Sequence, residues 1–218
     1  MKSYQKLLLA NKSWAHAQNE EDPSFFEKMA AGQNPEFLWI GCSDSRAPAD
    51  KLTNTEPGQI FVHRNVANLV VHTDFNLLSV LQYAVEVLKV KHIMVVGHYG
   101  CGGVRAAMGN DSLGIIVSWI RNIKDVYDKH EDELLTYNNL DERADKLAEF
   151  NVQAQVENLM KTSIVQKAWS TGEYPYLHGW VLDLKSGLIK ELVEIDSTKM
   201  GEVGGVYKYK YANALVNS

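Results

Sequence analysis

The sequence predicts an α/β fold in which a mainly parallel β-sheet is flanked by helices and preceded by an N-terminal helical arm. The principal observation is that short β-like runs alternate with longer segments of helical periodicity. The chain has 218 residues, of which 45% are hydrophobic, and this is enough to bury a full core. Because no repeat, low-complexity tract or Pro/Gly/Ser-rich linker interrupts the chain, we expect one domain over residues 1–218, with the arm at 1–34 and the α/β core at 35–218.

Five short runs have the composition of strands. They span residues 36–40, 59–63, 92–96, 176–184 and 188–194. The second run follows a Pro57-Gly58 turn, and the third is rich in β-branched residues and ends at Gly97. The last two are joined through residues 185–187, Lys-Ser-Gly, which is typical of a turn.

The segments between these runs have helical spacing. About the first 30 residues mix charged and apolar positions, as one or two helices would. Thr73-Asp74 is expected to cap a helix in which apolar residues recur from Leu77 to Leu88. Two further helices are predicted, one over residues 114–127 and one long helix over residues 141–169.

Composition excludes several classes of partner. The net charge is −5, and no stretch of lysine and arginine is dense enough to neutralise a row of phosphates, so we expect no nucleic-acid partner. The apolar run at residues 7–10 is too short for a signal-peptide core, and no run is long enough to cross a bilayer. Two cysteines without a dense framework favour a reducing compartment, and we expect a cytoplasmic protein.

The two cysteines stand in similar settings. Cys42 follows the apolar run at 37–40, and His98 and Cys101 follow the run at 93–96, so each group comes at the carboxyl end of a predicted strand. Ligands of parallel sheets bind beyond these ends, and the groups can therefore converge although they are 59 positions apart. Two thiols and one imidazole form the three-ligand set of a catalytic zinc, whereas structural zinc normally takes four ligands. We predict one zinc ion per chain.

Other interpretations of these residues are weaker. A lone buried cysteine or histidine is usually part of the core. A thiol phosphatase needs five residues between cysteine and arginine, but only three separate Cys42 from Arg46, and the Cys-x-x-Cys motif of redox dithiols is absent from the sequence. A nucleophilic cysteine with His98 as its base stays open, although it does not explain the second cysteine.

Asp44 and Arg46 follow the first cysteine closely. Asp44 is expected near the same ion, either as a fourth ligand or as a hydrogen-bond partner of a metal-bound water. Arg46 is its natural partner, because the planar guanidinium can bind both oxygens of a carboxylate. The simpler alternative is an ordinary surface ion pair.

These residues resemble a known family, the β-class carbonic anhydrases. The motifs that carry the resemblance are Cys-Ser-Asp-Ser-Arg at 42–46 and His-Tyr-Gly-Cys-Gly-Gly at 98–103, and the similarity covers essentially the whole chain, including 61–68 and 178–180. The resemblance implies that Cys42, His98 and Cys101 hold zinc and that Asp44 and Arg46 form a gating pair. The implied reaction is the reversible hydration of carbon dioxide to bicarbonate and a proton, by attack of zinc-bound hydroxide.

The same resemblance implies further residues and an assembly. It places Gln33, Phe61 and Tyr83 around the substrate pocket, and we add Val66 as an apolar wall for carbon dioxide. It implies a homodimer or homotetramer in which the helical arm embraces a neighbour. The aromatic residues of the arm, Trp14, Phe25 and Phe26, are candidate anchors for that contact, with packing inside the chain as the alternative. His63 and His72 are candidates for a proton shuttle by position only.

One branch of the family binds bicarbonate at a regulatory site and closes its zinc site with the aspartate. Trp39, Gly41 and Arg64 agree with this branch. Leu182 does not, because it cannot donate the hydrogen bond that a tyrosine would, and Ala47 stands where a valine is usual. The sequence therefore leaves regulation by bicarbonate open.

Charge counting predicts the pH behaviour of such a site. Two thiolates cancel both charges of the zinc ion, so we expect its water to have a higher pKa than water in a three-histidine site and activity to rise on the alkaline side. Arg46 would hold Asp44 away from the metal. Two alternatives keep the metal: a carbon disulfide hydrolase on the same fold, and a non-catalytic zinc-binding protein with Asp44 as a permanent ligand.

Overall fold

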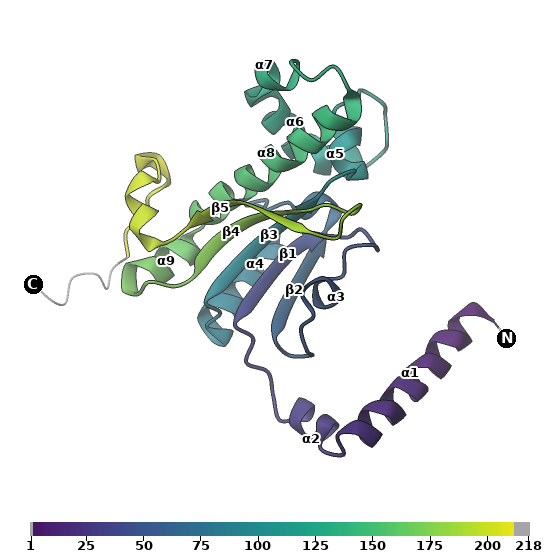
Figure 1. Cartoon of the computed structure of the whole chain (residues 1–218). Helices are drawn as coiled ribbons and strands as arrows, with labels where there is room; N and C mark the ends of the chain where they lie inside the picture. The colour runs from purple at the N-terminus through teal and green to yellow at the C-terminus, as the bar shows by residue number, and fades with distance from the viewer. Residues whose placement is uncertain (1, 212–218) are drawn as a thin grey trace, which may run out of the picture. The chain divides into compact units, whose positions relative to one another are not determined.

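The computed structural model describes residues 2–211, which form two compact units (Figure 1). The boundary lies between Asn34 and Pro35. The first unit contains the helices α1 (Ser3–Glu21) and α2 (Phe25–Ala30), and the second contains all the strands. The interpretation of the whole chain as one domain stays a prediction.

The first unit is held together by three aromatic rings. Trp14 of α1 packs edge-to-face against Phe25 and Phe26, with ring centroids 6.2 and 5.7 Å apart. Helix α1 has no buried residue within this chain, and three successive leucines, residues 7–9, are exposed. The packing inside the chain that the sequence allowed for the aromatic residues is therefore present.

The second unit is built on a five-stranded sheet with the order β2-β1-β3-β4-β5 (Figure 1). The strands are β1 (Phe37–Cys42), β2 (Ile60–Asn65), β3 (His92–His98), β4 (Tyr176–Leu182) and β5 (Ile189–Ile195). The first four pair in parallel, and β5 runs antiparallel to β4 at the edge. The predicted α/β class with a mainly parallel sheet is confirmed, and all five predicted strands are present.

Helices connect the strands: α3 (Ala49–Thr53), α4 (Phe75–Gln82), α5 (Gly102–Ala107), α6 (Ile116–Lys129), α7 (Glu131–Leu134), α8 (Leu140–Met160) and α9 (Ser163–Thr171). The 3-10 helix η1 (Val66–Asn68) and the π-helix η2 (Tyr83–Leu88) also lie between strands, and the 3-10 helices η3 (Ser197–Glu202) and η4 (Gly205–Tyr207) follow β5. Asp74 caps α4 as predicted, because its carboxylate accepts from the Asn76 N–H at 3.0 Å. Over residues 2–211, every helix is too short or too polar to cross a membrane.

The prediction of one long helix over residues 141–169 is wrong. Helix α8 ends at Met160, and Thr162 separates it from α9. The Thr162 hydroxyl donates to the Leu159 carbonyl at 2.7 Å and accepts from the Val165 N–H at 3.2 Å, so one residue closes the first helix and caps the second. Apolar periodicity does not reveal this break, because both helices contribute buried residues to the same core cluster.

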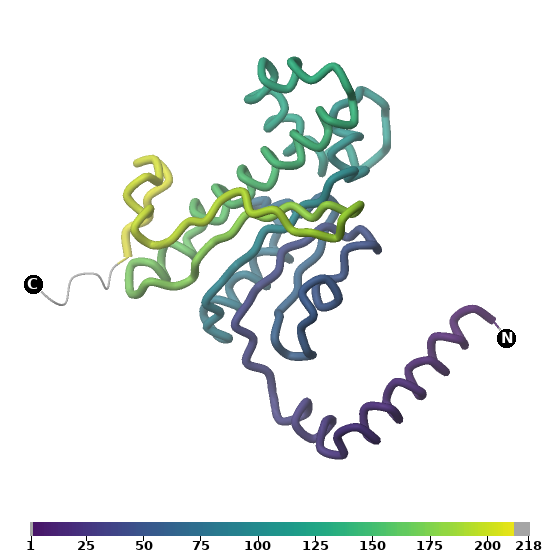
Figure 2. The backbone as a smooth tube through the Cα atoms, viewed as in Figure 1, coloured from purple at the N-terminus to yellow at the C-terminus, as the bar shows by residue number. Residues whose placement is uncertain are grey.

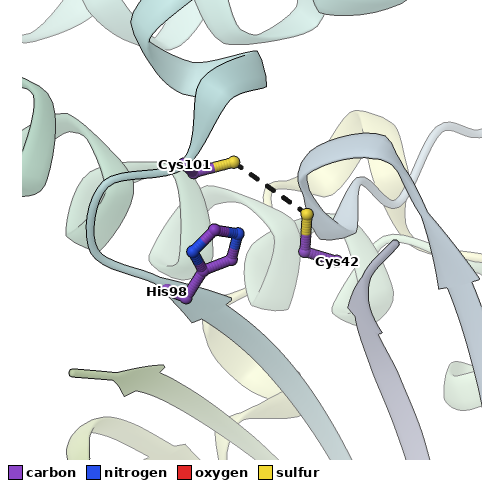
Figure 3. A group of neighbouring side chains, drawn as sticks. All are labelled: Cys42, His98 and Cys101. Atoms are coloured by element: carbon purple, nitrogen blue, oxygen red, sulfur yellow. Dashed lines mark hydrogen bonds between the residues drawn. The ribbon is translucent and has the colours of Figure 1, made fainter. Parts of the chain in front are cut away.

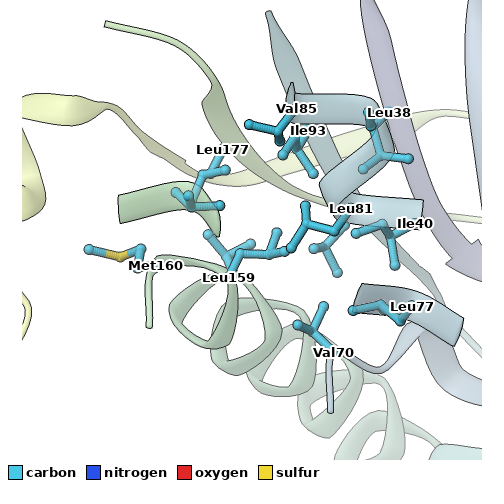
Figure 4. Packing of buried hydrophobic residues seen from close by; sticks show 14 of the residues in the cluster. Leu38, Ile40, Val70, Leu77, Leu81, Val85, Ile93, Leu159, Met160 and Leu177 are labelled. Carbon is cyan, nitrogen blue, oxygen red and sulfur yellow. The ribbon is translucent and has the colours of Figure 1, made fainter. Parts of the chain in front are cut away.

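One face of the sheet carries the main hydrophobic core (Figure 4). Apolar residues of β1 and β3, among them Leu38 and Ile93, pack here against α4, α8 and α9. Helix α8 lies along β3 and β4. Its close approach requires glycine in β4, because a Cβ at Gly179 would lie 3.0 Å from Val152 of α8 and 2.7 Å from Val193 of β5.

The segment after β5 returns to α9, and this return can be followed in Figure 2. The Gln166 side chain donates to the Tyr207 carbonyl at 3.0 Å and accepts from the Tyr209 N–H at 3.1 Å. The Tyr211 hydroxyl donates to the Ser163 carbonyl at 2.7 Å. These bonds tie the end of the described chain to the helical face of the sheet.

The core position of Leu159 generates a stability prediction. Replacing this fully buried residue by alanine should lower the free energy of unfolding by roughly 2–5 kcal/mol, because it removes buried methyl groups and leaves a cavity. Urea denaturation at one fixed protein concentration measures the change. The matched control is Leu188→Ala, at a site where leucine is 71% exposed, and this variant should stay within about 0.5 kcal/mol of the parent. Equal losses in the two variants would contradict the assigned core.

Candidate metal centre

The sheet brings both cysteines and one histidine together at the carboxyl ends of its parallel strands. Cys42 is the last residue of β1, His98 is the last residue of β3, and Cys101 precedes α5. The two strands are parallel neighbours, so their carboxyl ends lie together. All three side chains are buried, the two sulfurs are 4.0 Å apart, and the three candidate ligand atoms lie within 4.8 Å of one another (Figure 3). The structure therefore produces the convergence that the sequence predicts.

The loop between His98 and Cys101 is shaped by hydrogen bonds from outside it. Gly100 has a φ of +66°, and its N–H donates to the Asp145 carboxylate at 2.8 Å. The Tyr99 N–H donates to the Leu182 carbonyl at 3.0 Å, and the Tyr99 hydroxyl donates to Glu149 at 2.6 Å. These partners fix the turn that carries two of the three candidate ligands.

His98 is oriented with one nitrogen unsatisfied. Its Nδ1–H donates to the Tyr99 carbonyl at 3.0 Å, so that in the neutral ring the lone pair lies on Nε2. Nε2 is buried and has no hydrogen-bond partner, and the Asp44 carboxylate is 3.7 Å from it. A buried lone pair beside two sulfurs is costly unless a cation binds it. The residues therefore fit a metal ion, and a donor set of two sulfurs and one imidazole suits zinc better than magnesium or calcium.

The two thiols share one negative charge. A hydrogen bond from Cys101, opposed by burial and aided by His98, lowers the pKa of Cys42 to about 4. The pKa of Cys101 is raised, because a second thiolate would be buried against the first. The charge of a divalent cation removes this opposition, since a coordinating thiol is deprotonated outright. The electrostatics of the pair thus favour a metal as much as its geometry does.

Asp44 is clamped by Arg46. The guanidinium donates to both carboxylate oxygens, at 2.9 Å from Nε and 2.7 Å from Nη2, and the Arg46 backbone N–H donates to Oδ1 at 2.9 Å. This contact holds the pKa of Asp44 well below its ordinary value. A charged carboxylate therefore faces the candidate metal position while its partner holds it in place.

Arg64 holds the backbone between Cys42 and Asp44 in place, a role that the sequence did not reveal. Its guanidinium donates to the Cys42 carbonyl at 2.9 Å and also to the Asp44 carbonyl. Sequence reasoning could have found these bonds only by knowing that β2 lies beside β1. Arg64 thereby orients the backbone that carries Cys42 and Asp44.

The other proposed regulatory residues lie inside the core. Trp39 is buried and meets Trp180 edge-to-face at 6.4 Å. Gly41 allows this, because a Cβ at that position would lie 2.3 Å from the Trp39 ring nitrogen. Leu182 and Ala47 are buried as well. A bicarbonate site at Trp39 and Arg64 stays a prediction.

The predicted pocket residues are distributed over several elements. Phe61 of β2 and Tyr83 of η2 lie with ring centroids 5.8 Å apart. Val66 and Cys101 both lie beside Gly103, because a Cβ at Gly103 would be 3.0 Å from the Val66 side chain and 4.0 Å from the Cys101 sulfur. Gln33 belongs to the first unit, and its place at the pocket stays a prediction.

A cavity of about 610 Å³ opens beside the candidate ligands. Its lining includes Arg46, Tyr99, Gly100, Cys101, Arg105 and Asp145. Phe61, Val66 and Tyr83 do not line this cavity. The cavity therefore gives a polar approach to Cys101 that the sequence did not predict.

The two histidines named as proton carriers are both engaged. His63 is buried, which lowers its pKa, and it lies 3.3 Å from the Asn65 amide. His72 is hydrogen-bonded through Nε2 to the Asn158 carbonyl at 2.8 Å. These contacts therefore give no support to His63 or His72 as a proton shuttle.

A strained turn after β2 is held against the site by α8. Ala67 and Asn68 have positive φ values of 65° and 48°. The buried Asn151 donates to the Ala67 carbonyl at 3.1 Å, and the buried Gln155 accepts from the Val70 N–H at 2.8 Å. The turn presents the Ala67 N–H to the sulfur of Cys42, which helps to lower the pKa of that thiol. Sequence reasoning does not find Asn151 and Gln155, because no local sequence pattern indicates these distant contacts.

Comparisons with known proteins point to one family. A family model described as carbonic anhydrase matches residues 37–189. A curated relative from Emericella nidulans, named carbonic anhydrase, is 47% identical over 190 residues, which cover 87% of this chain and 83% of the relative.

Two solved structures are similar over most of the chain. A tetrameric β-carbonic anhydrase from Sordaria macrospora has 39% identity and a TM-score of 0.85, with coverage of 88% of this chain and 98% of its own. A β-carbonic anhydrase from Aspergillus fumigatus has 35% identity and a TM-score of 0.88, with coverage of 96% and 100%. The similarity thus extends over both sequence and fold.

The support of the strained turn can be tested at Asn151. Asn151→Ala removes the donor to Ala67 and leaves a buried amide of Gln155 without its partner, so the free energy of unfolding should fall by about 1–3 kcal/mol. Urea denaturation measures it. Gln153→Ala, a half-buried position on the same helix, is the matched control and should change stability much less. An unchanged Asn151→Ala protein would show that the turn does not depend on α8.

Proposed function

Because this chain belongs to the β-class carbonic anhydrase family, we propose that it catalyses the reversible hydration of carbon dioxide to bicarbonate and a proton with one zinc ion per chain. The observation that carries the proposal is the buried group of Cys42, His98 and Cys101, with the clamped Asp44 carboxylate facing it. Three protein ligands and an open fourth position are the pattern of catalytic zinc.

The ligands would be the two sulfurs and Nε2 of His98. When bound, zinc supplies a Lewis acid that lowers the pKa of a coordinated water and so makes it a nucleophile, although two thiolates weaken this effect. The Tyr99 carbonyl holds the imidazole in the tautomer that leaves Nε2 free. Because the thiolates cancel both charges of the ion, activity should rise on the alkaline side.

Asp44 and Arg46 would form the gate. The two contacts from the guanidinium hold the carboxylate away from the ligand group and leave it charged, so that it can accept a hydrogen bond from the nucleophile and orient it. Without Arg46 the carboxylate, already 3.7 Å from Nε2 of His98, would be free to take the open position. This arrangement supports a working site over a permanently closed one.

Carbon dioxide is small and apolar, so its pocket should be apolar on one side. Val66 is a proposed wall, and its place beside Gly103 and the second cysteine supports that role. Phe61, Tyr83 and Gln33 are proposed on the family resemblance. The reaction also releases a proton.

We further propose a homodimer or homotetramer, as the Sordaria macrospora relative is tetrameric. The apolar residues that α1 leaves exposed support a role for this helix in assembly. The acidic net charge supports the expectation of no nucleic-acid partner. The cytoplasmic location stays a prediction.

Arg46→Ala is the direct test of the gate. Stopped-flow carbon dioxide hydration should fall by roughly 10²–10³-fold, because Asp44 is no longer held in its orienting position, while zinc content stays at about one per chain. Arg121→Ala, at an exposed arginine on α6, is the matched control and should keep full activity and zinc. Loss of zinc from Arg46→Ala would make Arg46 a structural residue, and full activity would remove the gate from the mechanism.

The ligand set is tested by Cys101→Ser. A serine hydroxyl is a poor zinc ligand, so the purified variant should contain far less than one zinc per chain by mass spectrometry of metals and should lose hydration activity. Circular dichroism should show the parent secondary structure. A variant that retains a full zinc ion would exclude Cys101 from the ligand set.

A further inference from the structure

A second group of possible metal ligands lies on β4 and β5, away from the first. It consists of His178, Glu191 and Glu194, whose ligand atoms lie within 4.8 Å of one another. His178 belongs to the His-Gly-Trp motif at 178–180, which the proposed reaction does not use. The two glutamates are exposed, whereas His178 is only 8% exposed.

A β-bulge brings the two glutamates to the same side of the sheet. His178 pairs with Glu194 and Gly179 with Val193, but Trp180 pairs with Glu191, so the register shifts between Gly179 and Trp180. In a regular strand, residues three apart point to opposite faces. The extra residue in β5 reverses this relation, and bulges commonly re-aim side chains in this way.

His178 has one satisfied nitrogen and one orphan. Its Nε2 lies 3.0 Å from Nδ1 of His92, and its Nδ1 is buried without a hydrogen-bond partner, 3.6 Å from the Glu194 carboxylate. Burial, and then the neighbouring His92, lower the pKa of His178, so the ring is neutral. A proton on Nε2 can donate to His92, and this leaves the Nδ1 lone pair facing the glutamates.

This arrangement lacks a positive charge. A lone pair and two carboxylates in mutual proximity repel unless a cation lies between them. Over residues 2–211, neither glutamate forms an ion pair with lysine or arginine, and Lys190 is engaged by Glu149. A metal-ligating histidine typically donates its other N–H to a neighbouring acceptor, and Nδ1 of His92, 3.0 Å from Nε2 of His178, can be that acceptor when Nε2 carries the proton.

We propose that His178, Glu191 and Glu194 form a second divalent-cation site, which takes a borderline transition metal such as zinc. One imidazole and two carboxylates match this class, whereas magnesium and calcium prefer ligands that are all oxygen. The Glu194 side chain is 56% exposed, so the ion exchanges with solvent and completes its coordination with water. The ion would join β4 to the edge strand β5 across the bulge.

Equilibrium dialysis of the full chain against zinc, with metal content measured on the retained protein, tests this site. The wild type should retain one zinc more per chain than His178→Ala. Glu194→Gln, an exposed change that leaves the core intact, should also lose the second ion or bind it at least about tenfold more weakly. Glu56→Gln, an exposed glutamate between α3 and β2, is the matched control and should bind as the wild type does.

Equal zinc content in the wild type, His178→Ala and Glu194→Gln would overturn the proposal, whatever the total. The comparison is independent of the proposed function, because it counts the difference between variants. If the cysteine site bound no zinc, the wild type would retain one ion and His178→Ala none. If both sites bind zinc, the wild type would retain two ions per chain and His178→Ala one.

Discussion

The parallel pairing of β1 with β3 determines where everything else in the site can be. It aligns the two strands from Phe37 and His92 onward, so that both end at one edge of the sheet and place Cys42 beside His98. The pairing is stable because both strands are buried, with the face that carries Leu38 and Ile93 packed under α4, α8 and α9. The loop to Cys101 then needs to span only two residues. Burial of both faces stabilises the sheet and leaves the carboxyl ends of its strands as the place where a ligand can bind.

The charges at the carboxyl ends of β1 and β3 favour a bound cation. Without a cation the two thiols carry only one negative charge between them, and one imidazole nitrogen has no hydrogen-bond partner. A zinc ion would stabilise both thiolates and bind that nitrogen. Arg46 pairs with the Asp44 carboxylate, which could otherwise compete for the open position, through its Nε and Nη2 nitrogens. An unsatisfied buried histidine nitrogen near acidic groups likewise marks the group of His178, Glu191 and Glu194 on β4 and β5. Both proposals thus follow from the rule that a buried polar atom needs a partner.

The alternation of strands and helices, the placement of both cysteine motifs at strand ends and the cap at Asp74 could all be predicted from sequence, because each is a local pattern. What could not be predicted depends on contacts between distant segments. Thr162 divides two helices that share one apolar face, Arg64 reaches the backbone of a neighbouring strand, and Asn151 holds a turn 84 positions away. The bulge in β5 also leaves no sequence signal, since it is defined by the register against β4. Residues that act through tertiary hydrogen bonds are therefore the ones that sequence patterns miss.

The most direct test of the central claim is stopped-flow carbon dioxide hydration by the wild type from about pH 6.5 to about 9, with zinc measured on the same sample. We expect fast hydration that rises with pH and about one zinc per chain at the cysteine site, counted after any exchangeable zinc has been removed by gel filtration. Zinc bound at that site without hydration at any pH would contradict it, because the site would then be closed or would serve another reaction.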